Sequence, residues 1–174
     1  MTSASASHSS FLVTGSAGFI GFHVSRSLLS QGAKVIGLDN YNDYYSPALK
    51  RDRDRELRQH PNFFSVEGDL ADLASLTALF EEHRPQKICH LAAQAGVRHS
   101  IDAPRAYVEA NLMGTFELLE AARAYPPAHM LLASTSSAYG ANTEMPYRET
   151  DRADAQMSFY AATKKATEAM AHSY

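Results

Sequence analysis

The chain has 174 residues, of which 45% are hydrophobic and 20% are charged. This balance is ordinary for a folded globular domain and excludes a largely disordered chain. The formal net charge is −3, so no basic footprint points to nucleic acid as a partner. No stretch approaches the ~20 apolar residues that a membrane helix requires, so we expect no membrane partner.

The first ten residues, Met1–Ser10, are mostly serine, alanine and threonine. They lack the positive and apolar regions of a secretory signal, so we interpret them as a disordered leader or a remnant of cloning. We expect the folded, nucleotide-binding domain to occupy residues 11–174.

From Phe11 onward, short apolar runs alternate with stretches of helical periodicity. The predicted strands are Phe11–Gly15, Lys34–Asp39, Phe63–Asp69, Lys87–Ala93 and Met130–Ser136. The predicted helices are Phe19–Ser30, Ser46–Gln59, Leu73–His83, Pro104–Tyr125 and Phe159–Tyr174. Such alternation indicates parallel βαβ units with right-handed crossovers. The fold class is therefore α/β, a doubly wound parallel sheet (Rossmann) in the order 3-2-1-4-5, with its ligand at the carboxyl ends of the strands.

The last residue, Tyr174, falls inside a helical pattern with no glycine stop and no sixth strand. A doubly wound fold normally has six strands in two halves. We therefore expect the domain to be truncated before its sixth strand and before any carboxy-terminal substrate-binding segment.

A glycine-rich loop, Thr14–Gly21, follows the first predicted strand and opens the first helix. Gly15 permits a tight turn, Gly18 lets the backbone approach a pyrophosphate, and Gly21 allows close helix–sheet packing. The helix N-terminus adds N–H groups and a positive dipole end. The loop predicts a dinucleotide site, although its spacing is G-x-x-G-x-x-G rather than G-x-G-x-x-G. The alternative is an ordinary strand–helix turn.

Asp39 closes the second predicted strand, where a carboxylate can accept hydrogen bonds from the adenosine ribose. Its charge would repel a 2′-phosphate and the neighbouring Asn40 is no phosphate clamp, so NAD is favoured over NADP. The alternative is a plain strand-end aspartate. The run Lys50–Glu56 alternates in sign, as on a solvated helix face, and only Lys50 is kept as a cofactor contact.

Tyr160 and Lys164 stand four residues apart and share a face of the last predicted helix. A nearby ammonium favours ionisation of a phenol, whose ordinary pKa is ~10. The hydroxyl-rich segment Ser134–Gly140 ends the fifth strand, where a hydroxyl can hydrogen-bond the substrate oxygen that the tyrosine deprotonates. With the glycine loop, these residues predict alcohol–ketone redox chemistry. The alternatives are a surface pair on a helix and a turn without a role.

Other nucleophiles and ligands are set aside. The eight histidines show no metal-type spacing, so no metal is predicted, and His90 is interpreted as a satisfied interior histidine. The serines of Ser134–Gly140 lack the G-x-S-x-G frame of a nucleophile elbow. The single cysteine, Cys89, cannot form an internal disulfide, which favours a cytoplasmic location.

These residues carry a family resemblance that runs from about Phe11 to the last residue. The chain resembles the extended short-chain dehydrogenase/reductase family, and within it the NAD-dependent nucleotide-sugar epimerases. The matching segments are Thr14–Gly21, Asp39–Asn40, Gly68–Leu70, His90–Ala93, Asn111, Ser134–Gly140 and Tyr160–Lys164. Within these enzymes it is most similar to the UDP-glucuronate 4-epimerases, through Asn42–Tyr45, Gln94–Arg98 and Tyr160–Lys165.

The resemblance implies a role for each matching residue. Tyr160 is implied as the catalytic base, Thr135 as the assisting hydroxyl, and Lys164 as a group that also holds the nicotinamide ribose. The implied substrate contacts are Arg98, Thr135, Ser136 and Ser137. Asp69 and Leu70 are implied to contact the adenine, and Asn111 to support the catalytic helix. The further cofactor contacts are Phe19, Ile20, Asn40, Leu91, Ala92, Ala93, Ala95, Asn111 and Ser134.

One absence separates members of the family. Similar dehydratases place Asp and Glu just after the active-site threonine, and decarboxylases place Glu there, whereas Ser136 and Ser137 stand there in this chain. Elimination of water from a 4-keto sugar needs an acid and a base beyond the tyrosine. We therefore expect 4-epimerisation of a nucleotide sugar, UDP-glucuronate first.

Two other functions stay open. One is epimerisation of UDP-glucose or a UDP-N-acetylhexosamine, and the other is a non-catalytic dinucleotide-binding module. The family's usual homodimer would use the helices Pro104–Tyr125 and Phe159–Tyr174. Residues 1–174 alone should bind NAD at most moderately and turn over little or nothing.

Overall fold

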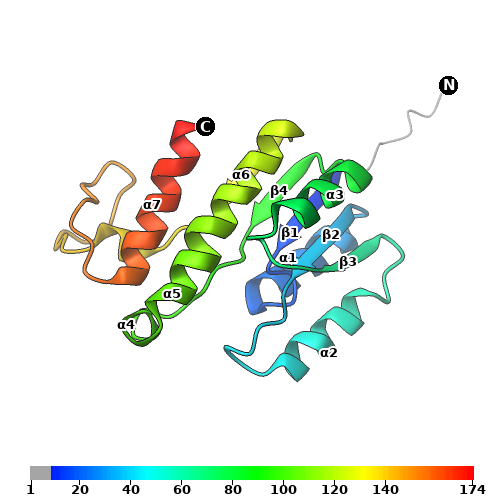
Figure 1. The fold of residues 1–174 in the computed structure, drawn as a ribbon, viewed down its shortest axis with the longest axis horizontal. Coiled ribbons are helices and arrows are strands. Elements are labelled where there is room, and N and C mark those ends of the chain that lie inside the picture. Colours follow the sequence, from blue (N-terminus) through cyan, green and yellow to red (C-terminus); the bar gives the residue numbers. More distant parts are fainter. Residues whose placement is uncertain (1–8) are drawn as a thin grey trace. The chain divides into compact units, whose positions relative to one another are not determined.

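A computed structural model describes residues 9–174 of the chain (Figure 1). The first eight residues, which make up most of the predicted leader, lie outside the described residues. The chain divides into two compact units. The first consists of residues 9–69, Thr77–Ala92 and Tyr125–Leu132, and the second of Leu70–Leu76, Ala93–Ala124 and Ala133–Tyr174.

The first unit is built on a five-stranded parallel sheet in the order β3-β2-β1-β4-β5, which confirms the predicted fold class and strand order. Its strands are β1 (Ser10–Thr14), β2 (Lys34–Asp39), β3 (Phe63–Glu67), β4 (Lys87–His90) and β5 (His129–Leu132). Its helices are α1 (Phe19–Ser30), α2 (Pro47–Leu57) and most of α3 (Leu73–His83).

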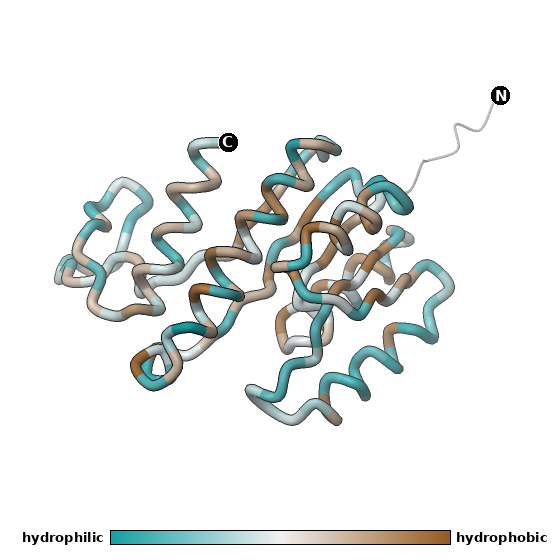
Figure 2. The backbone as a smooth tube through the Cα atoms, in the orientation of Figure 1, coloured by the Kyte–Doolittle hydropathy of each residue, from teal (hydrophilic) through white to brown (hydrophobic). Residues whose placement is uncertain are grey.

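Alternating side chains along β3 show that helices cover both faces of this sheet. Phe63 packs into a buried cluster with Phe22 of α1 and Leu57 of α2, whereas the next residue, Phe64, meets the ring of His83 in α3. The sequence of a strand that is covered on both faces is a continuous run of apolar residues. The strands accordingly appear largely hydrophobic and α2 largely hydrophilic in Figure 2.

Four strands end earlier than the apolar pattern predicts, the first of them, β1, at Thr14 rather than Gly15. β3, β4 and β5 each end at the last residue that pairs with the neighbouring strand. β4, for example, stops at His90, which pairs with Thr14, the last residue of β1. Beyond that pair, the partner strand offers no further ladder positions. The same limit stops β3 at Glu67 rather than Asp69, and β5 at Leu132 rather than Ser136. At its other end the sheet begins at Ser10, one residue before the predicted start.

The second unit is helical and contains α4 (His99–Asp102), α5 (Pro104–Tyr107), η1 (Val108–Met113), α6 (Gly114–Ala124), η2 (Ser136–Tyr139) and α7 (Phe159–Ser173). The α7 helix packs against α5, η1 and α6 (Figure 1). The predicted helix Pro104–Tyr125 is helical to Ala124, but η1 inside it is a π-helical stretch, a feature often found at functional sites.

The short helices α4 and η2 were not predicted, because four-residue helices give too few positions for a periodic pattern. Among residues 9–174, no helix combines the length and the apolar character that crossing a membrane requires.

Candidate functional site

The glycine loop of the first unit has the geometry of an anion-binding turn. Gly15 has a positive φ of 70°, and its N–H donates to the carbonyl of Leu38 at 2.7 Å. A Cβ at Gly21 would lie 2.0 Å from the Gly15 carbonyl oxygen, so only glycine fits there. The α1 helix starts after Gly18 without a side-chain cap and without an acidic residue in its first turn. Its first N–H groups and its dipole therefore suit a phosphate.

Asp39 is buried at the end of β2, with 8% of its surface exposed. Its two carboxylate oxygens accept hydrogen bonds from the N–H of Ala17 at 3.0 Å and from the N–H of Tyr41 at 2.9 Å. The carboxylate thus ties the glycine loop to the end of β2. Carboxylate oxygens can accept further hydrogen bonds, so this role leaves capacity for ribose hydroxyls.

Two more predicted cofactor residues are linked at the same strand ends. The exposed Asn40 donates to the Oδ2 of Asp69 at 3.0 Å. Lys50 is only 5% exposed and donates to the Oδ1 of Asn42 at 2.6 Å. Burial lowers the pKa of Lys50, and the charge of Asp39 opposes that shift.

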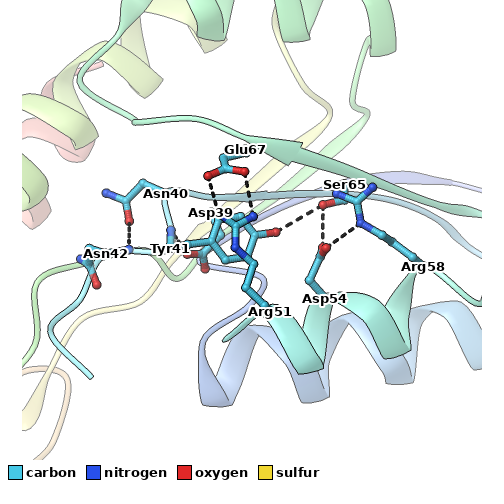
Figure 3. A network of polar contacts seen from close by, with 9 residues as sticks. All are labelled: Asp39, Asn40, Tyr41, Asn42, Arg51, Asp54, Arg58, Ser65 and Glu67. Atoms are coloured by element: carbon cyan, nitrogen blue, oxygen red, sulfur yellow. Dashed lines mark hydrogen bonds and ion pairs between the residues drawn. The ribbon is translucent and has the colours of Figure 1, made fainter. Parts of the chain in front are cut away.

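The charged run of α2 is only partly the solvated face that its alternation predicts. Figure 3 shows that two of its members, Arg51 and Asp54, reach residues of β3. Asp54 is 6% exposed and accepts from Ser65 and Arg58, each at 2.6 Å. Arg51 forms a two-pronged pair with Glu67 at 2.6 and 2.8 Å and stacks on the Tyr41 ring. This network fixes the end of β2 that carries Asp39.

A second tie joins the ends of β1 and β4. The Oγ1 of Thr14 accepts from the N–H groups of Leu91 and Ala92, both at 3.1 Å, and lies 2.8 Å from the Nδ1 of the buried His90. A Cβ at Gly15 would lie 3.0 Å from the Ala92 backbone. Two predicted cofactor contacts, Leu91 and Ala92, are thus held against the glycine loop. The exposed Phe19 and Ile20 start the adjoining helix.

In the second unit, Tyr160 and Lys164 lie on one face of α7, as their spacing predicts. Ser158 caps the helix and accepts from the N–H of Ala161 at 3.0 Å. Lys164 is 5% exposed, and this burial lowers the pKa of its ammonium while the charge of Glu168 opposes the shift.

The predicted hydroxyls begin the short helix η2. Thr135 caps it, its Oγ1 accepting from the N–H of Ser137 at 3.2 Å, and Ser136 is exposed. Ser134 instead donates to the carboxylate of Glu168, which also accepts from Lys165 at 2.8 Å. Burial raises the pKa of Glu168, but these two hydrogen bonds and the charges of Lys165 and Lys164 together outweigh it, so the net shift is downward. Ser134 therefore links this segment to α7.

Asn111 lies within η1 and is 1% exposed. Its Oδ1 accepts from the Gln94 N–H at 2.7 Å, and its Nδ2 donates to the Thr163 Oγ1 at 3.0 Å and to the Gln94 carbonyl at 3.3 Å. Both amide donors are thus engaged within the unit. Asn111 thus joins η1 to α7 through Thr163, and its predicted roles in supporting a catalytic helix and contacting the cofactor stay predictions.

The other predicted site residues of this unit differ in how far they are exposed. Leu70 is 8% exposed and lies beside Gly114, while Ala93, Ala95 and Arg98 are exposed. No group of three or more His, Cys, Asp or Glu side chains in the described part of the chain is arranged to hold a metal ion.

Several residues that organise these sites were missed from the sequence. Ser100 accepts from the N–H of Tyr160 at 3.1 Å, and the ring of Tyr107 contacts the Tyr160 ring edge-on. In the first unit, Arg53 donates to the Ala17 carbonyl at 3.3 Å and to the Tyr45 hydroxyl at 3.2 Å. No local pattern marks these residues, because their partners are distant in the sequence.

The parallel order 3-2-1-4-5 and the glycine turn between β1 and α1 define a Rossmann-like α/β protein. Residues 12–174 match the family described as GDP-mannose 4,6 dehydratase, and the chain belongs to this family of NAD-dependent epimerases and dehydratases.

Individual relatives are similar over nearly the whole chain. A probable UDP-glucuronate 4-epimerase of Rhizobium meliloti (strain 1021) is 51% identical over 94% of this chain and 48% of its own length. UDP-glucuronate 4-epimerase 3 of Arabidopsis thaliana is 51% identical over 95% of this chain and 38% of its own. The chain therefore spans about half, or less, of the length of these curated relatives.

Solved structures agree with this placement. The UDP-glucuronic acid 4-epimerase of Bacillus cereus, in complex with UDP-glucuronic acid and NAD, superposes with a TM-score of 0.87 at 32% identity, covering 95% of this chain and 52% of that one. The UDP-glucose 4-epimerase of Brucella ovis, in complex with NAD, gives a TM-score of 0.82 at 30% identity, covering 95% and 47%.

Proposed function

We propose that this chain is the NAD-binding and catalytic part of a nucleotide-sugar 4-epimerase, and that its substrate is UDP-glucuronate. The observation that carries the proposal is the pair of Tyr160 and the buried Lys164 on α7 of a Rossmann-like chain. The relatives named as UDP-glucuronate 4-epimerases and the Bacillus cereus complex with NAD support the substrate and the cofactor.

The first unit would hold the adenosine diphosphate part of NAD. The N–H groups at the start of α1 suit the pyrophosphate, and Asp39 suits the adenosine ribose. The negative charge of Asp39 disfavours a 2′-phosphate and so favours NAD. Lys50 and Asn40 flank this carboxylate as further contacts.

The second unit would hold the reacting atoms. NAD, when bound, would supply the reversible hydride chemistry at C4 of the sugar. Tyr160 would remove the proton of the C4 hydroxyl, and Thr135 would hold the same oxygen. Lys164, with its charge buried on the same face of the helix as Tyr160, would bind the nicotinamide ribose. The 4-keto sugar then rotates in the site so that its opposite face is presented. Tyr160 returns the proton as the hydroxyl reforms with the opposite configuration at C4.

The two residues after Thr135 favour epimerisation over dehydration, although the family takes its description from a dehydratase. Ser136 and Ser137 cannot supply the extra acid and base that elimination requires. A UDP-glucose or UDP-N-acetylhexosamine epimerase remains the second candidate, since solved structures of such enzymes also match this chain. A non-catalytic dinucleotide-binding module has no need of the Tyr160 and Lys164 pair.

We further propose that a carboxy-terminal segment completes the sugar pocket in the complete protein, since the relatives are about twice as long. Residues 1–174 alone should then bind NAD at most moderately and turn over little or nothing. A cytoplasmic homodimer through α5, η1, α6 and α7 fits the exposed side chains of Val108, Met113 and Phe116. Light scattering that detected only monomer would contradict the dimer.

The direct test is an assay of the complete protein that contains this sequence. UDP-glucuronate, UDP-glucose and UDP-N-acetylglucosamine are each supplied with NAD, and the C4 epimer is measured by NMR. We expect turnover of UDP-glucuronate, and loss of at least about 10²-fold in kcat for Tyr160→Phe. Exclusive turnover of another sugar would support the second candidate. NAD binding without turnover of any of them would support the non-catalytic module.

A further inference from the structure

Tyr107 connects two segments of the second unit that lie far apart in the sequence. Its side chain is fully buried, with 0% exposed. Its hydroxyl oxygen lies 2.7 Å from the carbonyl oxygen of Ala95 and 2.5 Å from that of Gly96, so its one proton is donated to a shared pair of acceptors. Its ring meets the Tyr160 ring edge-on, with centroids 6.1 Å apart and an interplanar angle of 77°. One side chain therefore touches both the loop 94–98 and the predicted catalytic tyrosine.

Ser100 makes a second connection between the same two segments. It is 1% exposed, and its Oγ donates to the Val97 carbonyl at 2.6 Å while accepting from the N–H of Tyr160 at 3.1 Å. The first N–H groups of a helix have no partner within the helix. Ser158 serves one of these groups at the start of α7, and Ser100 serves another from a different helix. The backbone of Tyr160 is thus fixed to α4.

Core packing alone does not account for the Tyr107 hydroxyl. A phenylalanine would fill nearly the same volume and keep the edge-on ring contact. Its one O–H proton is shared between two carbonyl oxygens of a loop in which Gly96 adopts a positive φ of 101°. That conformation is accessible mainly to glycine, and the hydroxyl stabilises it. The same loop carries Ala95 and Arg98, the predicted contacts for cofactor and substrate.

We propose that Tyr107 and Ser100 are positioning residues for the epimerisation, and that the two ends of Tyr107 have separable roles. The ring fixes the orientation of the Tyr160 phenol, which matters for turnover. The hydroxyl fixes the loop 95–98, which matters for substrate affinity. This inference rests on the proposed function, because it takes Tyr160 to be the base.

The test compares four variants of the complete protein. Tyr107→Phe removes the hydroxyl and keeps the ring, Tyr107→Leu removes both, and Ser100→Ala removes the link to Tyr160. Tyr125→Phe is the matched control, since its hydroxyl bonds Glu81 in the first unit at 2.6 Å. Steady-state kinetics with UDP-glucuronate give kcat and KM. Hydrogen–deuterium exchange reports on residues 94–101, with 114–124 as the internal reference.

Tyr107→Phe should raise KM about fivefold or more, leave kcat within about twofold, and speed exchange over 94–101. Tyr107→Leu and Ser100→Ala should in addition lower kcat about tenfold or more, because the phenol loses its fixed orientation. Tyr125→Phe should change none of these quantities.

Unchanged KM and unchanged exchange in Tyr107→Phe would overturn the role of the hydroxyl. Equal kcat in Tyr107→Phe and Tyr107→Leu would overturn the role of the ring. If the unaltered protein turned over no UDP-sugar, the proposed function would fail, and exchange over 94–101 would still test the link between Tyr107 and the loop.

Discussion

Replacing Gly21 by alanine tests the geometry of the glycine loop most sharply. The new Cβ would lie 2.0 Å from the Gly15 carbonyl oxygen, 2.7 Å from the Gly15 carbonyl carbon and 2.9 Å from the Ser16 Cα. All three are backbone atoms, so no flexible side chain can move aside. The loop must shift, and this strains the hydrogen bonds from Gly15 to Leu38 at 2.7 Å and from Gly18 to Gly15 at 3.0 Å.

The cost can be estimated from these parts. Overpacking costs about 1–3 kcal/mol, and two weakened hydrogen bonds cost about 1 kcal/mol each. The higher helix propensity of alanine offsets about 1 kcal/mol of this cost, so the free energy of unfolding should fall by about 2–4 kcal/mol. Urea unfolding measures this loss as a lower midpoint. The matched control is Gly68→Ala, whose Cβ meets only the Leu38 Cδ1, at 3.3 Å, and should cost less than about 1 kcal/mol. Equal midpoints for the two variants would refute the reasoning.

Three further predictions concern the second unit. Lys164→Met should abolish turnover yet stabilise the fold by about 1 kcal/mol at neutral pH, because it removes a buried charge. The folded-state pKa of Lys164 is lowered, so the extra stability of the methionine variant should shrink as pH rises towards the ordinary lysine pKa of ~10.4. Denaturant titrations at several pH values measure this difference in stability. A difference that grew with pH would contradict the burial argument. Glu168→Gln removes the charge that raises the Lys164 pKa, so it should lower that pKa further and move the alkaline limb of the kcat–pH profile to lower pH. An unmoved limb would contradict an electrostatic effect of Glu168 on Lys164. Asn111→Leu leaves Gln94 and Thr163 without their buried partner and should cost about 2–4 kcal/mol in urea unfolding, whereas a neutral result would exclude a supporting role.

The long helices could be predicted because their signals are local, and the sheet order followed from the alternation of strands and helices. The bounds of α1, β2 and α3 match the predicted ranges, since periodicity and glycine positions define them within the chain. The ends of β3, β4 and β5 could not be read in the same way. An apolar residue stays in a strand only while the neighbouring strand continues, and that depends on register.

The same distinction holds for the candidate sites. Asp39 follows from a strand end, and Lys164 from its spacing to Tyr160. The burial of Asp54 within a charged run depends on Ser65 of the adjacent strand, which no charge pattern reveals. The partners of the buried Asn111 amide, Gln94 and Thr163, likewise lie far from it along the chain.

The central claim is that a hydride leaves C4 of the sugar and returns to the same carbon, while Tyr160 carries the hydroxyl proton. The complete protein with UDP-glucuronate deuterated at C4 tests this claim most directly. The account predicts that the epimer keeps deuterium at C4 and that none enters the water. Loss of deuterium to solvent during epimerisation would contradict it.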